Sequence, residues 1–171
     1  MDRKLSIPLN VFASFLLLFV FVYYGYYVYI GVMWGYSERM LMLLVSDGVF
    51  WLFVPAAIGI FRREKWSWWL TISVFVQLFI AKIIAIAANV FLLVSGNVAE
   101  PLQGSNMAIE FLYLVLYLII IVSLSLEPIR KFSNVNKSFL EAFWRVFLLA
   151  IGIYVIHFIL TVVAITAIQP T

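Results

Sequence analysis

The sequence predicts an all-α, polytopic integral membrane protein: a bundle of five transmembrane helices joined by short loops. Of its 171 residues, 66% are hydrophobic and only 11% are charged, whereas soluble domains are roughly 45–50% apolar and about 25% charged. The apolar residues also fall into five runs that are long enough to cross a bilayer as helices. The chain is therefore expected to form a single transmembrane domain over residues 1–171.

Each apolar run is bounded by polar or turn-forming residues. The five predicted spans cover about residues 9–33, 40–61, 68–94, 107–126 and 139–168. Pro55 lies inside the second run and has no amide to donate to the carbonyl of Trp51, so a kink or a replacement donor is expected there. Ser138 and Glu141 precede the fifth run with the spacing of a capping box.

The basic residues predict the orientation of the bundle. Five crossings put the amino terminus on the same side as the loops after the second and fourth spans. That side carries Arg3, Lys4, Arg62, Arg63, Lys65, Arg130, Lys131, Lys137 and Arg145, and the other side carries only Arg39. This asymmetry predicts a cytoplasmic amino terminus and an extracytoplasmic carboxyl terminus in the cell membrane. The alternative, four crossings and one re-entrant segment, would break this partition. Trp66, Trp68 and Trp69 are expected to anchor the arginine-rich side at the interface.

Several polar residues lie inside the predicted spans, and the topology places them toward the outer half of the bilayer. A lysine deep in a span costs roughly 2.5–3.5 kcal/mol on insertion scales unless it is partnered or hydrated. Helical spacing puts polar side chains on shared faces in the third, fourth and fifth spans. The candidate ligand- or ion-binding residues are Asp47, Lys82, Asn89, Glu110, Tyr113, Tyr117, Tyr154 and His157, with Thr161 on the stripe of the last two.

These stripes predict an outward-facing polar pocket around Lys82, with Asp47 or Glu110 as its counter-ion. A small anionic or amphipathic ligand would fit such a pocket, with its charge on the lysine and its apolar part on the tyrosines. For each residue a structural role stands beside the functional one. Lys82 and Asp47 could form an ion pair that only fixes helix register, and His157 could simply be bonded to a neighbouring side chain.

The sequence carries no signature of a known catalytic or cofactor-binding site. It has no cysteine and one histidine, so no ordinary zinc site is expected, and no cofactor or metal is inferred. The basic residues sit in short loops rather than on a nucleic-acid-binding face. We expect a non-catalytic accessory subunit of a larger membrane complex, or a self-associating protein. The alternatives are a small transporter or ligand-binding protein that uses Lys82 with Asp47 or Glu110, and a membrane-embedded enzyme.

Overall fold

The computed structural model describes residues 2–96 and 104–168, and every regular element in these two segments is helical. The helices are α1 (Asp2–Trp34), α2 (Glu38–Ser46), the 3₁₀ helix η1 (Gly48–Leu52), α3 (Phe53–Phe61), α4 (Lys65–Val94), α5 (Gly104–Ser125), α6 (Glu127–Phe132) and α7 (Phe139–Ile168). The connection predicted after the third span lies mostly outside the described residues.

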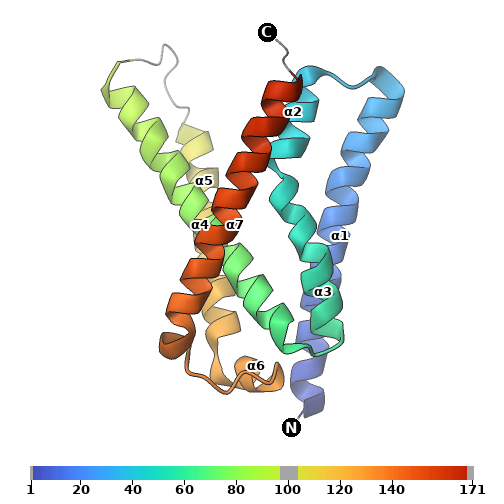
Figure 1. The fold of residues 1–171 in the computed structure, drawn as a ribbon, viewed down its shortest axis with the longest axis vertical. Helices are drawn as coiled ribbons and strands as arrows, with labels where there is room; N and C mark the ends of the chain where they lie inside the picture. The colour runs from blue at the N-terminus through green and yellow to red at the C-terminus, as the bar shows by residue number, and fades with distance from the viewer. Residues whose placement is uncertain (1, 97–103, 169–171) are drawn as a thin grey trace.

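Four of these helices, α1, α4, α5 and α7, are long and apolar enough to cross a membrane. The segment formed by α2, η1 and α3 meets the same test when it is counted as one span bent by 45°. The helices run side by side along the long axis, and α6 lies across one end (Figure 1). That end also holds the amino terminus of α1 and the α3–α4 turn, whereas the carboxyl end of α7 and the α1–α2 turn lie at the opposite end.

The bend in the second span lies at Asp47, eight residues before the proline that marks the segment in the sequence. Pro55 is the third residue of α3, where a missing amide costs little because the first turn of a helix has no internal acceptors. The Phe53 amide, which donates to the Phe50 carbonyl, also donates to the Trp51 carbonyl. The expected replacement donor is therefore present, but the direction of the chain changes at Asp47 and Gly48.

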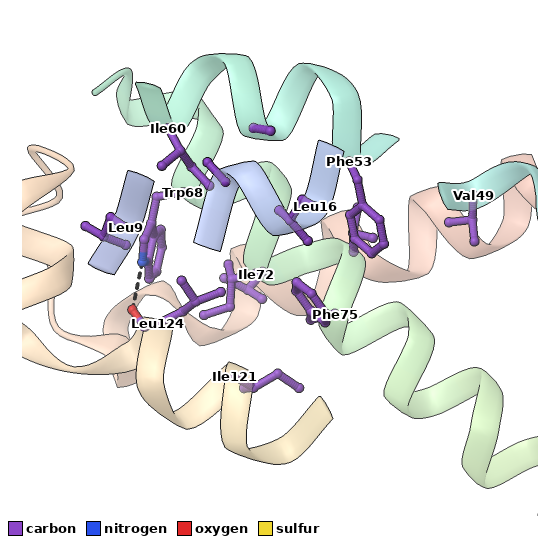
Figure 2. Packing of buried hydrophobic residues seen from close by; sticks show 14 of the residues in the cluster. Leu9, Leu16, Val49, Phe53, Ile60, Trp68, Ile72, Phe75, Ile121 and Leu124 are labelled. Carbon is purple, nitrogen blue, oxygen red and sulfur yellow. Dashed lines mark hydrogen bonds between the residues drawn. The ribbon is translucent and has the colours of Figure 1, made fainter. Parts of the chain in front are cut away.

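The core is concentrated toward the end that carries α6. In α1, one face at helical spacing is buried: Leu9, Ala13, Leu16, Val20 and Tyr24. These residues pack with Phe53 and Ile60 of α3 and with the first half of α4 (Figure 2). Trp68 is only 2% exposed, and its indole nitrogen donates to the Leu124 carbonyl of α5 at 2.8 Å. The expectation that Trp68 is an interfacial anchor is therefore wrong, because this indole is the centre of the core.

Two arginines connect neighbouring elements at this end. Arg63 has a left-handed backbone, donates to Ser6 of α1 and places its guanidinium 4.7 Å from the centre of the Phe132 ring. Arg130 donates to the carbonyls of Ser125 and Lys137, so it closes the loop between α5 and α7. We call this the basic end; it also holds Arg62, Lys65, Lys131 and the first turn of α1 with Arg3 and Lys4.

The capping box before the last helix is confirmed. The Glu141 amide donates to the Ser138 hydroxyl at 3.3 Å, and the Ser138 amide donates to the Glu141 carboxylate at 3.2 Å. At the start of α2, the Ser37 hydroxyl accepts from the Met40 amide at 3.2 Å. Both contacts satisfy amides that a helix leaves free in its first turn.

Candidate functional site

An ion pair joins α4 to α5 in the half of the bundle away from the basic end. The Lys82 ammonium contacts the Glu110 carboxylate, and it also lies 5.2 Å from the centre of the Tyr113 ring. Both charged side chains are partly shielded, with exposed fractions of 24% and 34%. Of the two counter-ions that the sequence allowed for Lys82, the structure brings Glu110 to it.

Asp47 is held by a different set of partners. The Tyr23 hydroxyl of α1 donates to its carboxylate, and the Tyr24 hydroxyl donates to its backbone carbonyl at 2.8 Å. The residue lies where α2 ends and η1 begins, so its carbonyl and its carboxylate are both available to side chains of α1. Tyr23 and Tyr24 belong to the tyrosine run of the first span, but composition alone could not show which of these tyrosines face inward.

On α7, the imidazole of His157 faces the same bend from the other side. A methyl group added at Gly48 would stand 3.7 Å from His157 Nε2. This nitrogen is shielded from solvent and has no hydrogen-bond partner among the described residues, and the same is true of the Thr161 hydroxyl one turn further along α7. On α4, the Ser73 hydroxyl and the Gln77 side-chain oxygen are likewise buried without a partner in that part of the chain.

These contacts occur at a similar distance from the basic end. At a rise of 1.5 Å per residue, Lys82 lies about 26 Å from Lys65 along α4, and His157 lies about 27 Å from Phe139 along α7. Tyr23 is at a similar height on α1, about 26 Å beyond Ser6, which contacts the basic end. We call the residues at this height the polar layer: Tyr23, Tyr24, Asp47, Lys82, Glu110 and His157.

A chain of aromatic rings links the Lys82–Glu110 pair to Asp47. Tyr117 of α5, which stacks on Tyr113, has its ring 6.2 Å from Phe75 of α4, and Phe75 stacks on Phe53 at 5.3 Å. The chain continues through Phe50 to Tyr23 of α1. A continuous series of ring contacts thus connects the Lys82–Glu110 pair to the Asp47 bend across the bundle.

Two of the residues that the sequence selected take no part in these contacts. Asn89 is exposed on α4 and makes no hydrogen bond within the described residues, so its shared face with Lys82 does not bring it to the polar layer. Tyr154 stacks on Phe158 of its own helix with ring centres 6.5 Å apart. Ser73 was not selected from the sequence, because a single serine in an apolar helix gives no signal of burial.

The chemistry available to these groups is hydrogen bonding and ion pairing. No group of three or more histidine, aspartate or glutamate side chains within residues 2–96 and 104–168 is arranged to hold a metal ion. Comparisons of the chain with protein-family models, with curated proteins and with solved structures find no match.

Proposed function

We propose that this chain is an integral membrane protein that crosses the bilayer five times, with its basic end in the cytoplasm and its carboxyl terminus outside. The bend at Asp47 supports counting α2, η1 and α3 as one crossing, since the two halves together have the length and hydropathy of a span. The common location of Arg62, Arg63, Arg130 and Lys131 at one end supports this orientation.

Within the membrane, we propose a non-catalytic role as a subunit that binds other membrane helices. The observation that carries this proposal is an apolar arm formed by residues 83–94 of α4 and 108–119 of α5. These far halves lean away from α2 and α7 (Figure 1) and expose Phe91, Val94 and Leu112 by 69%, 83% and 66%. Of the α5 residues Ala108–Ser125, only 6% are buried inside the chain.

The ion pair favours this role over binding of an anionic or amphipathic ligand. Lys82 is the one lysine inside the predicted spans, and Glu110 compensates its charge. An anion would have to displace a carboxylate that is already in contact and partly desolvated, at a cost that a single new contact rarely recovers. The pair therefore serves to hold the two helices of the arm together.

Site-specific photo-crosslinking tests the proposed role. A photoreactive residue would replace Phe91 or Leu112 on the arm, with Leu160 on α7, 61% exposed, as the control position. We expect both arm positions to give the same protein adduct, either a second copy of the chain or another membrane subunit identified by mass spectrometry. Adducts only with lipid, or the same adducts from Leu160, would contradict the proposal.

A further inference from the structure

The fold gathers basic residues from distant parts of the sequence at one end of the bundle. The basic end contains seven lysines and arginines from three stretches: the first turn of α1, the α3–α4 turn with the first residue of α4, and α6. The same stretches contain only three acidic residues, and one of them is paired with Lys131. Within the described residues, no salt bridge neutralises four of the other basic side chains, which are Arg62, Arg63, Lys65 and Arg130. This end therefore carries positive charge that the chain itself does not compensate.

An apolar groove opens beside this charge. It lies between the start of α1 and the last two turns of α5, has a volume of about 230 Å³, and is lined in part by Leu5, Phe12 and Ile120. Ser123 is the one polar side chain among the described residues that line it. Phe12 and Ile120 lie within predicted spans, whereas Leu5 and Ile129 lie beyond them. The groove therefore runs from the level of the acyl chains to the level of the headgroups.

Arg63 stands where this groove reaches the basic end. A smaller cavity shares three lining residues with the groove, including Ile129, and is also lined by Arg63 and Phe132. The guanidinium lies 4.7 Å from the centre of the Phe132 ring and donates one hydrogen bond, to the Ser6 hydroxyl. Arg63 is exposed, and its other side-chain N–H groups have no acceptor within the described residues. These groups can therefore donate to a phosphate, whose oxygens match the planar fork of a guanidinium.

We propose that one anionic phospholipid binds at the basic end, with its phosphate on Arg63 and one acyl chain in the groove between α1 and α5. The uncompensated charge favours an anionic headgroup over a zwitterionic one. The apolar lining favours a lipid over a free anion, because only a lipid fills the groove as well. Basic pockets between membrane helices bind anionic lipid headgroups through the same chemistry.

Two further features of the fold suit this ligand. The amino end of α4 begins two residues after Arg63 and adds partial positive charge. In the orientation proposed above, the lipid belongs to the cytoplasmic leaflet, whose surface is negatively charged. Lipid binding goes beyond the role of a subunit and uses no residue of the apolar arm, so the crosslinking experiment and the lipid experiment can fail independently.

Thermal unfolding of the purified full-length chain in detergent tests the proposal. Three samples receive dioleoyl phosphatidylglycerol, dioleoyl phosphatidylcholine or inorganic phosphate; the two lipids share their acyl chains and differ in headgroup charge. A ligand that binds only the folded state raises Tm as its concentration rises. We expect phosphatidylglycerol to raise Tm by several degrees and the other two additions to change it little. No rise with phosphatidylglycerol, or an equal rise with phosphatidylcholine or with phosphate, would overturn the proposal.

Two matched pairs of variants locate the site. Arg63→Gln removes the charge at the groove, and its control Arg62→Gln removes a charge from the same turn that lines neither cavity. Ser123→Leu fills the groove, and its control Val122→Leu changes a position on α5 that is 55% exposed and lies outside the groove. We expect Arg63→Gln and Ser123→Leu to lose the response to phosphatidylglycerol and both controls to keep it. If Arg63→Gln does not fold, the second pair decides. A response that survives Ser123→Leu, or equal responses in Arg62→Gln and Arg63→Gln, would overturn the proposal.

Discussion

Lys82 of α4 and Glu110 of α5 form an ion pair across the two helices that depart most from the rest of the bundle. The single variant Lys82→Met leaves Glu110 partly buried without its partner. Breaking a fully buried pair costs about 3–5 kcal/mol, and the partial exposure of this pair reduces the expected loss to roughly 1–3 kcal/mol. The measurement is the free energy of unfolding in detergent. The double variant Lys82→Met/Glu110→Leu should recover most of the loss.

The Lys131–Glu127 pair at the basic end is the matched control. The Lys131 ammonium nitrogen lies 2.6 Å from a Glu127 carboxylate oxygen, but the two side chains are 68% and 65% exposed, respectively. Exposed pairs contribute little, so Lys131→Met should barely change the free energy of unfolding. Equal losses for Lys82→Met and Lys131→Met would show that the α4–α5 pair is solvated like a surface pair.

The same control pair has a pH signature. Its hydrogen bond with Lys131 holds the pKa of the Glu127 carboxyl below its ordinary value. Because the folded pKa is the lower one, the small stabilisation is present at neutral pH and is lost as the pH falls through the folded pKa of Glu127. Carbon NMR of the carboxyl group should show this pKa rise toward its ordinary value in Lys131→Met. An unchanged pKa would mean that the pair does not persist in solution.

The hydroxyl of Tyr23 donates to the Asp47 carboxylate, so Tyr23→Phe should destabilise the bend. A hydrogen bond to a charged group contributes about 1.5–3 kcal/mol, and the bond from Tyr24 to a neutral carbonyl contributes about 0.5–1.5 kcal/mol. We therefore expect Tyr23→Phe to cost more than Tyr24→Phe in thermal unfolding. Tyr26→Phe, at an exposed position on the same helix, is the control and should be neutral. If Tyr26→Phe lowered the stability as much as Tyr23→Phe, the Tyr23 hydroxyl would not be a specific stabiliser of the bend at Asp47.

Trp68→Phe removes the indole that joins α4 to α5 at the basic end. The change opens a cavity in the core and leaves the Leu124 carbonyl without its donor. Together these effects should cost about 2–4 kcal/mol of unfolding free energy. Trp66→Phe, at a half-exposed position two residues earlier on the same helix, should cost less than about 1 kcal/mol. Similar losses for the two tryptophans would mean that Trp68 is not central to the core.

Gly59→Ala tests the close approach of α3 to α4. An added methyl carbon would stand 2.5 Å from the Ser67 side-chain carbon and 2.9 Å from Trp66. Overpacking of this kind typically costs about 1–3 kcal/mol. Gly25→Ala, where the methyl group meets nothing within 4 Å, should be neutral or stabilising in the same assay. A neutral Gly59→Ala would show that these helices lie further apart.

The sequence predicted the helical elements and the end-to-end separation of basic and interior polar residues because both depend on composition and period. It also predicted the capping box, which depends on local spacing. The bend at Asp47 escaped prediction because the proline nearby is the stronger local signal, although a proline in the first turn of a helix disturbs nothing. The choice of Glu110 over Asp47 as the partner of Lys82 depends on helix rotation in three dimensions. The burial of Trp68 depends on the position of α5, so the sequence could not distinguish this tryptophan from Trp66.

The orientation of the bundle is tested most directly by labelling single cysteines in intact cells. The natural chain has no cysteine, so Arg39→Cys at the start of α2 and Asn136→Cys in the basic end would each be the sole target of a membrane-impermeant maleimide. Both positions are exposed. We expect Arg39→Cys to be labelled in intact cells and Asn136→Cys only after the membrane is permeabilised. Labelling of Asn136→Cys in intact cells, or of both positions from the same side, would contradict the five-crossing orientation.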